Sequence, residues 1–193
     1  MFGARIVIAD ADMAFRKKLK GTLIHAGYFI AGEAESGRGA LKVIFQAEPD
    51  LVIMDAKLPG AEGLEIARII EEHRVAPVIL LTTSYELELL EEVKASWYFA
   101  CLIKPVSDIQ LLLTIEIALT NFKKLIKMEA ENKKLKQALE ERKLVERAKG
   151  LIMEVKGLSE KEAYRYLRKL SMDKCVPMVR VAQQVISHFS KEL

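Results

Sequence analysis

Five short apolar runs alternate with amphipathic stretches along the first 120 residues of the chain. The runs are rich in β-branched residues and do not alternate apolar with polar side chains, a pattern typical of strands covered on both faces in a parallel sheet. The expected strands are residues 6–8, 28–31, 51–54, 78–81 and 100–103, and the expected helices are residues 13–26, 36–47, 62–73, 85–95 and 107 onward. Five strand–helix repeats predict an α/β fold with a doubly wound, five-stranded parallel sheet, whose functional site lies beyond the C-terminal ends of the strands.

Polar residues suited to phosphoryl transfer follow four of these runs. Asp10 and Asp12 follow the first run, Asp55 the third, Thr82 the fourth and Lys104 the fifth. Carboxylates hold Mg²⁺ through hard oxygen ligands, an aspartate can act as a nucleophile that forms an acyl phosphate, and hydroxyl and ammonium donors stabilise charge on phosphoryl oxygens. Each residue alone fits an ordinary polar group at the end of a buried strand, but together they indicate a phosphoryl-transfer site.

With these residues at these positions, residues 4–120 resemble a two-component receiver domain. The resemblance implies that Asp55, in the segment MDAKLPGAEG, is the phosphoacceptor and that Thr82 is the switch hydroxyl. It implies that Lys104, followed by an expected cis Pro105, senses the charge of the phosphoryl group. Mg²⁺ would be the cofactor, and a histidine kinase would be a partner. The metal ligands that the resemblance implies are Asp10, Asp55 and the backbone carbonyl of Lys57.

Three residues depart from the receiver pattern. Ala11 stands where receivers carry the second acid after the first strand, and a methyl group cannot coordinate Mg²⁺. Asp12 is the nearest substitute, but its backbone position points it elsewhere. Cys101 replaces the usual aromatic switch, and Thr83 stands where a smaller residue usually leaves access to the aspartate. Two interpretations stay open: ordinary Mg²⁺-dependent phosphorylation, or a degenerate receiver that serves as a constitutive or differently triggered platform.

A long helix is predicted to follow the receiver-like domain of residues 1–120, because neither Pro nor Gly occurs between Ile109 and Gly150. Within a linker of residues 121–142, apolar residues fall at alternating spacings of three and four, like the a/d seam of a coiled coil. Asn132 takes an a position, where a buried Asn commonly selects register and oligomer state. The seam consists of Leu125, Met128, Asn132, Leu135 and Leu139. It can pair with a second copy in a homodimer or pack on the chain's own domain, and the pattern does not choose between these.

Charge is divided unevenly along the chain. Residues 1–120 contain 12 Lys and Arg against 17 Asp and Glu, whereas residues 121–193 contain 18 against 10. An acidic part joined to a basic part is typical of a regulatory domain attached to a polyanion-binding domain.

Three amphipathic segments predict a compact three-helix unit over residues 143–193. The first segment stops at Gly157, the second opens with a capping box of Ser159 and Glu162, and the third begins near Pro177. The stretch VERAKGLIMEVKGLSEKEAYRYLRKLSM and the later VAQQVI resemble the ANTAR domain along nearly its whole length. The resemblance implies binding to paired hairpin loops of leader transcripts and a role in transcription antitermination.

Basic and aromatic residues of this unit are the candidate RNA contacts. Loop bases stack on aromatic rings or guanidinium planes, and Lys and Arg neutralise phosphates. The candidates are Lys143, Arg147, Lys149, Tyr164, Arg165 and Arg168. Tyr164 lies at an apolar helical phase, which favours a core position over a base platform. The two arginines also fit an ordinary solvated face. Met153 and Met172 are predicted to be packing residues. Where the family usually carries basic residues before the last helix, the chain reads CVPM at residues 175–178.

The remaining features favour a cytoplasmic protein without membrane association. Cys101 and Cys175 fit neither a metal cluster nor a disulfide framework. The first residues lack a signal-peptide pattern, and no apolar run approaches the roughly 20 residues that span a bilayer. The leading hypothesis is a response regulator that acts as an RNA-binding transcription antiterminator and is not an enzyme in its own right. The alternative is a phosphorylation-independent protein-interaction module with a degenerate receiver. A DNA-binding factor is less favoured, because no helix-turn-helix unit is recognisable.

Overall fold

The computed structural model describes residues 3–83 and 99–189 of the chain. The chain divides into two compact units, Met1–Ile126 and Lys127–Leu193, and the division falls inside the predicted linker. Each unit is described by itself.

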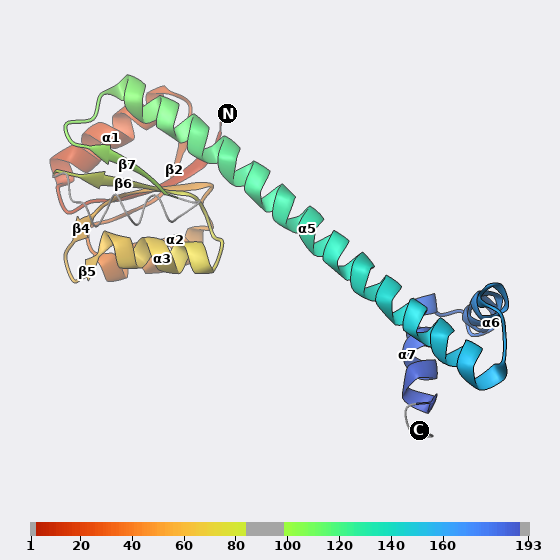
Figure 1. The fold of residues 1–193 in the computed structure, drawn as a ribbon. Helices are drawn as coiled ribbons and strands as arrows, with labels where there is room; N and C mark the ends of the chain where they lie inside the picture. The colour runs from red at the N-terminus through yellow and green to blue at the C-terminus, as the bar shows by residue number, and fades with distance from the viewer. Residues whose placement is uncertain (1–2, 84–98, 190–193) are drawn as a thin grey trace. The chain divides into compact units, whose positions relative to one another are not determined.

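The first unit is built on a five-stranded parallel sheet, as predicted (Figure 1). Its strands lie in the order β2-β1-β3-β6-β7, which is a doubly wound arrangement with the chain reversing direction next to β1. The strands are β1 (Arg5–Ala9), β2 (Phe29–Ala34), β3 (Leu51–Asp55), β6 (Val78–Thr82) and β7 (Phe99–Ile103). A small antiparallel pair, β4 (Lys57–Leu58) and β5 (Ala61–Glu62), was not expected from the sequence.

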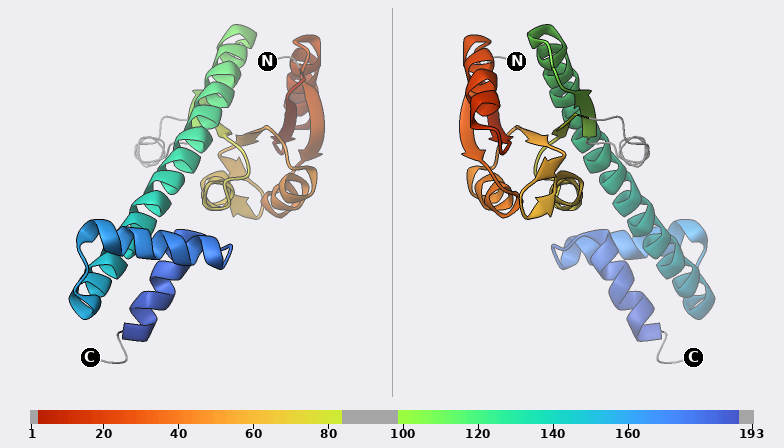
Figure 2. Two further views of the ribbon diagram at one scale, coloured as in Figure 1. Left: turned by 90° about the vertical axis from the view of Figure 1, so that its right-hand side faces the viewer. Right: turned by 90° about the vertical axis from the view of Figure 1, so that its left-hand side faces the viewer.

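Helices cover both faces of the sheet, which explains why the strands carry no apolar–polar alternation. Helices α2 (Gly37–Ala47) and α3 (Gly63–Glu72) pack on one face, and α1 (Met13–His25) packs on the other with the start of α5 (Figures 1 and 2). Successive residues of β1 therefore enter different cores: Val7 packs with α2 and α3, whereas Ile8 packs with α1 and α5. The helix predicted over residues 85–95 lies outside the described residues.

Helix α5 (Asp108–Lys156) is continuous over 49 residues, in agreement with the predicted long helix. Its first turns pack on the sheet through the buried side chains of Leu111, Ile115 and Leu119. Glu116 accepts a hydrogen bond at 2.7 Å from the Tyr28 hydroxyl, and burial together with this carboxylate raises the pKa of Tyr28 to about 12.

Most of the predicted seam of α5 is exposed on the helix surface. The Met128, Leu135 and Leu139 side chains are 65%, 71% and 53% exposed, and Asn132 between them is exposed too. Leu125, the first residue of the seam, is half-buried, so the exposed stretch of the seam runs from Met128 to Leu139.

The second unit packs the end of α5 against α6 (Glu160–Asp173) and α7 (Met178–Phe189). Its core consists of Ala148, Ile152, Ala163, Leu167, Val181, Ala182 and Val185. The predicted helix boundaries are confirmed: Gly157 has a left-handed φ of +66°, and the Glu162 carboxylate accepts a hydrogen bond at 2.9 Å from the Ser159 N–H. The packing role predicted for two methionines is wrong, because Met153 and Met172 are 37% and 67% exposed. None of the helices in the described ranges is long and apolar enough to cross a bilayer.

Candidate functional site

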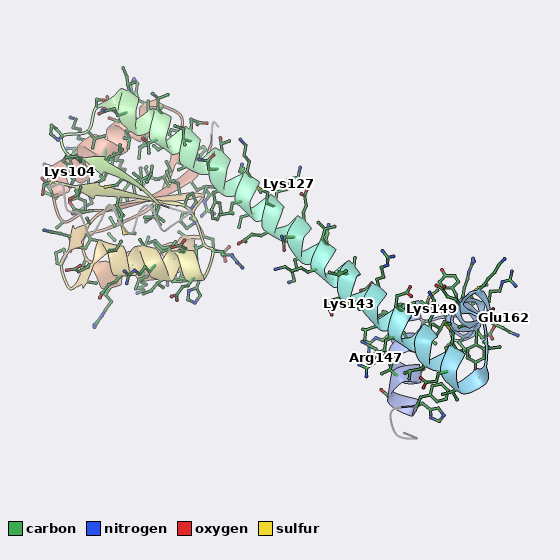
Figure 3. The ribbon with its side chains drawn as sticks, viewed as in Figure 1. Lys104, Lys127, Lys143, Arg147, Lys149 and Glu162 are labelled. Carbon is green, nitrogen blue, oxygen red and sulfur yellow. The ribbon has the colours of Figure 1, made fainter. Side chains whose placement is uncertain are left out.

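The sheet brings four of the predicted site residues to one edge. Asp10 directly follows β1, Asp55 and Thr82 end β3 and β6, and Lys104 directly follows β7. Because these neighbouring strands are parallel, their C-terminal ends meet at the same edge. The Lys104 ammonium bridges two of them: it donates a hydrogen bond at 2.6 Å to Asp10 Oδ2 and another to Asp55 Oδ2 (Lys104 is labelled in Figure 3).

Asp10 is held in place by its neighbours in the loop that follows β1. Its side chain is 3% exposed, and its Oδ1 accepts a hydrogen bond at 2.9 Å from the Asp12 N–H. The Arg16 guanidinium donates a hydrogen bond to the Asp10 carbonyl oxygen. Both oxygens of the Asp10 carboxylate are thus engaged within the protein.

Asp12 serves α1 rather than the site. Its carboxylate accepts hydrogen bonds from the Ala14 N–H at 2.8 Å and the Phe15 N–H at 3.1 Å, which makes it the N-cap of the helix. The expectation that Asp12 points elsewhere is confirmed.

Lys104 is fixed at both ends. Its N–H donates to the Thr82 carbonyl at 2.7 Å, and the predicted cis peptide joins it to Pro105. Its ammonium lies 4.3 Å from the centroid of the Phe15 ring. Partial burial opposes the charge of Lys104, but the hydrogen bonds to Asp10 and Asp55 outweigh burial and raise its pKa.

Asp55 lies where β3 enters a tight turn that leads to α3. Its Oδ1 accepts a hydrogen bond at 2.7 Å from the Lys57 N–H, and the Ala56 N–H donates to the Leu81 carbonyl at 2.7 Å. Gly63 closes this turn, because a Cβ on Gly63 would lie 2.3 Å from the Asp55 carbonyl oxygen. Gly63 was not expected at the site, because a single glycine at the start of a helix carries no signal for such a close approach.

The donor set at this edge does not fit the Mg²⁺ shell that the receiver resemblance implies. Ala11 offers no oxygen where the second acid belongs, and within the described residues no three His, Cys, Asp or Glu side chains are placed to hold a metal ion. Lys57 follows Asp55 closely in β4, but one backbone carbonyl does not replace a missing carboxylate.

The other two departures lie on β7 and directly after β6. Cys101 is half-buried in β7 and packs against the core on the side of α2 and α3, and burial raises the pKa of its thiol. Thr82 is buried at the end of β6, whereas Thr83 is exposed. Strand β7 therefore carries a small thiol at the position where receivers usually carry an aromatic ring.

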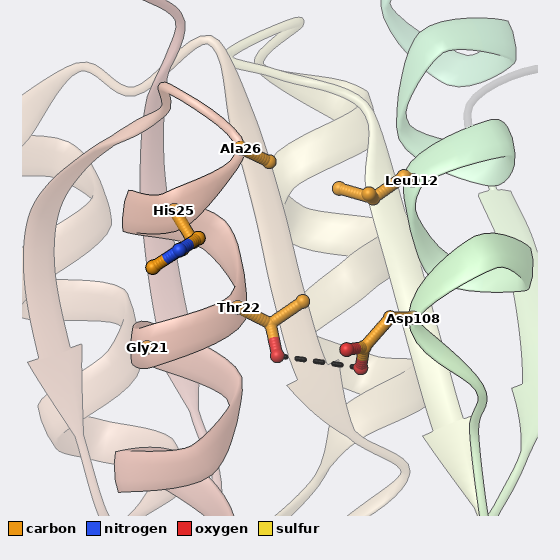
Figure 4. Close-up of a pocket in the computed structure, with 6 residues that line it drawn as sticks. All are labelled: Gly21, Thr22, His25, Ala26, Asp108 and Leu112. Atoms are coloured by element: carbon orange, nitrogen blue, oxygen red, sulfur yellow. Dashed lines mark hydrogen bonds between the residues drawn. The ribbon is translucent and has the colours of Figure 1, made fainter.

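A shallow pocket of about 440 Å³ lies between α1 and the start of α5 (Figure 4). Two of its lining residues are joined by a hydrogen bond of 3.3 Å from the Thr22 hydroxyl to Asp108. The pocket contains none of the predicted site residues. Its lining consists of Gly21, Thr22, His25, Ala26, Asp108 and Leu112.

In the second unit, α6 presents basic and aromatic side chains on its outer face. Tyr164 is 44% exposed, so the interpretation of this residue as core is wrong. Arg165 and Arg168 are also exposed, and so is Lys161, which sequence reasoning missed. The spacing of residues 161, 164, 165 and 168 places all four on one face of the helix. The opposite face carries Ala163 and Leu167, which are fully buried.

The three candidates on α5 do not behave alike. Lys143 and Arg147, both labelled in Figure 3, are exposed. Lys143 forms an ion pair at 2.8 Å with Glu140. Lys149 is instead buried, and its ammonium lies 2.8 Å from Glu160 and 2.9 Å from Glu146. The hydrogen bonds to Glu160 and Glu146 raise the pKa of Lys149. Lys149 is therefore engaged inside the unit and is not grouped with the exposed candidates.

Comparison with known proteins assigns both units. Residues 6–116 match the response regulator receiver domain, and residues 133–186 match the ANTAR domain. The chain is 37% identical over 182 residues to the transcriptional regulatory protein PdtaR of Mycobacterium tuberculosis, and the match covers 94% of this chain and 89% of PdtaR.

Solved receiver structures show the same fold as the first unit. A CheY-like receiver domain protein from Methanospirillum hungatei superposes with a TM-score of 0.58 at 29% identity, and the match covers 63% of this chain and 97% of that protein. The chemotaxis protein CheY4 of Vibrio cholerae superposes with a TM-score of 0.55 at 29% identity, and the match covers 60% and 98% of the two chains.

Proposed function

Because the chain belongs to the response regulators in which a receiver domain is followed by an ANTAR domain, we propose that it binds RNA through α6 and acts as a transcription antiterminator. The observation that carries the proposal is the exposed Tyr164 between Lys161, Arg165 and Arg168 on the outer face of α6. An exposed aromatic ring among cations is what single-stranded loops need: bases stack on the ring, and the cations neutralise phosphates.

The inner face of α6 supports this function by holding the outer face rigid. Ala163 and Leu167 are fully buried against the other helices of the unit. Tyr164 and its basic neighbours are therefore displayed on a packed helix, so less conformational entropy is lost when RNA binds. Lys143 and Arg147 on α5 add positive charge for phosphate contacts, whereas Lys149 is assigned a structural role.

The exposed seam of α5 is proposed to pair with the same segment of a second copy. Met128, Leu135 and Leu139 are the apolar positions of this pairing, and Asn132 sets its register. A homodimer carries two ANTAR domains and can therefore hold two hairpin loops of one leader transcript. Joining two binding events in this way raises the apparent affinity through effective concentration without new contacts.

The receiver domain is proposed to regulate RNA binding in the cytoplasm, with a histidine kinase as its upstream partner if Asp55 accepts a phosphoryl group. The protein acts by binding and does not turn over a substrate. The alternative function, a protein-interaction module with no RNA ligand, takes its support from the departures from the receiver pattern at Ala11, Cys101 and Thr83.

Crosslinking of the full-length protein to cellular RNA, followed by sequencing, tests the function and identifies the transcript. Fluorescence anisotropy with the recovered two-hairpin RNA then measures the affinity of wild type and of Arg168→Ala. We expect an affinity that falls with added salt and is weaker for Arg168→Ala. Enrichment of proteins but no RNA by the wild-type chain would overturn the proposal and favour the interaction module.

A further inference from the structure

The sheet edge that carries Asp10 and Asp55 already contains a cation, the Lys104 ammonium. The Lys104 ammonium lies between the carboxylates of Asp10 and Asp55 and donates a hydrogen bond to each of them. The three side chains are 15%, 3% and 17% exposed, so water screens this cluster only weakly. One positive charge thus lies between two negative charges in a largely buried site.

The loop after β1 cannot supply the oxygen that a divalent cation needs next. Ala11 ends in a methyl group, and Asp12 is committed to the N-cap of α1 through two backbone N–H groups. Turning Asp12 toward the site would leave both of these donors without their acceptor. A Mg²⁺ ion would also have to share its ligands with the Lys104 ammonium, which already donates to both carboxylates. It would have two side-chain carboxylates rather than three to hold it.

We infer that Lys104 takes the place of Mg²⁺ in this receiver, so that the Asp10–Lys104–Asp55 cluster sets its resting state and the domain does not recruit a divalent cation. The inference rests on the receiver part of the proposed function and is independent of RNA binding. Its consequence is that Mg²⁺-dependent phosphorylation of Asp55 does not occur, because Ala11 has removed a ligand that the reaction requires.

The test compares the melting temperature of the full-length protein in MgCl₂ and in NaCl of equal ionic strength. Wild type is expected to melt at the same temperature in both salts. Ala11→Asp supplies the third carboxylate and is expected to melt higher in MgCl₂. If it binds with a Kd of about 1 mM, then about 10 mM Mg²⁺ raises its ratio of folded to unfolded molecules about tenfold. Met13→Asp is the matched control, because it adds the same charge two residues further on at a side chain that is 74% exposed.

Intact-mass measurement after incubation with acetyl phosphate and MgCl₂ provides a second readout. In the reaction tested, an Asp55 carboxylate oxygen attacks phosphorus, the bond from phosphorus to the acetate oxygen breaks, and acetate leaves. We expect no phosphoryl adduct on wild type, an adduct on Ala11→Asp, and none on Ala11→Asp combined with Asp55→Asn.

A MgCl₂-dependent phosphoryl adduct on Asp55 of the wild type would overturn the inference, and so would either of two melting results. One is a rise of the wild-type melting temperature in MgCl₂ that Asp55→Asn abolishes. This result does not depend on whether Ala11→Asp folds. The other is a folded Ala11→Asp protein that responds to MgCl₂ no more than wild type does. RNA affinity measured in EDTA is a separate readout, so failure of the proposed RNA function and failure of this inference are distinguishable.

Discussion

The Lys149 ammonium lies 2.8 Å from the Glu160 carboxylate, which joins the last turns of α5 to the first turn of α6. Glu146, one turn before Lys149 on α5, completes the arrangement at 2.9 Å. Lys149 is 7% exposed, whereas both glutamates reach solvent. The ion pairs therefore stabilise the packing of the two helices at the edge of the ANTAR core rather than presenting a cation to a ligand.

Replacing Lys149 with Met is expected to lower the melting temperature of the ANTAR unit and to leave RNA affinity unchanged at temperatures where the unit is folded. The reason is that the variant loses the tie to Glu160 but no exposed cation. Lys161→Met is the matched comparison: Lys161 is exposed on the proposed RNA-binding face of α6, so this variant should keep its stability and bind RNA more weakly. Thermal melting and anisotropy on both variants measure the difference. Equal losses of affinity in the two variants would contradict the structural role of Lys149.

The same ion pair predicts how stability depends on pH. The hydrogen bond from Lys149 holds the pKa of Glu160 below its ordinary value of 4.5. A carboxylate with a lowered pKa in the folded state adds stability above its ordinary pKa and loses it as the pH falls through the folded-state pKa. Lys149, whose pKa is raised above 10.5, loses its contribution only as the pH rises beyond that value.

Glu160→Gln should therefore melt below wild type at neutral pH, and the gap should close as the pH falls well below 4.5. Glu154→Gln, on an exposed part of α5, is the control and should track wild type at each pH. A gap that persists undiminished in acid would show that Glu160 acts through packing instead of charge.

Two glycine substitutions should have opposite effects on the receiver domain. A Cβ on Gly63 would lie 2.3 Å from the Asp55 carbonyl oxygen and 2.9 Å from the Ala56 Cα, so Gly63→Ala must move backbone. We expect it to destabilise the domain by about 1–3 kcal/mol, as overpacking does. Gly21 lies within α1, and a Cβ added there would meet no atom within 4 Å, so Gly21→Ala should stabilise the domain by about 0.5–1 kcal/mol. Urea denaturation of both variants gives the sign of the change in the free energy of unfolding.

The Tyr164 ring is expected to stack on a loop base. Tyr164→Ala should weaken RNA binding by about 1–3 kcal/mol, the usual contribution of one stacked base, whereas Tyr164→Phe should retain most of the affinity. Anisotropy with the same RNA measures both variants. Because Tyr164 is exposed, neither change should lower the melting temperature strongly. Similar affinities for wild type and Tyr164→Ala would exclude stacking at this position.

The α5 seam predicts a dimer that charge can disrupt. Leu135→Lys places like charges opposite each other in the proposed pairing and should convert the dimer to a monomer in sedimentation or light-scattering measurements. Lys136→Glu, at the next residue of the same helix, is the control for a change of charge outside the seam. A wild-type protein that is monomeric at the concentrations at which it binds two-hairpin RNA would rule out the pairing.

Local sequence patterns were sufficient for most of the architecture. The helix expected over residues 13–26 is α1 (Met13–His25), and the strand expected at residues 78–81 is the core of β6 (Val78–Thr82). Such elements can be predicted from sequence because their apolar pattern extends over several residues. The pair β4 and β5 was missed, because strands of two residues carry no periodicity at all.

The site was less completely predictable. Asp10, Asp55, Thr82 and Lys104 could be grouped because the parallel sheet brings strand ends together, and the absence of a carboxylate at Ala11 is visible in the sequence itself. The close approach of Gly63 to Asp55 was not predictable, since it depends on how the turn after β3 meets α3.

Sequence alone determined that the chain has two domains, which site residue follows which strand, and that the C-terminal unit is made of amphipathic helices. These features follow from residue types and their spacing. Only the tertiary structure decided that Tyr164 is exposed, that Met172 is not a packing residue and that Lys149 is buried between two glutamates. The physical reason is that a helix position becomes core or surface according to what packs against it. Spacing places a residue on a face, but the neighbouring helices determine whether that face meets protein or water.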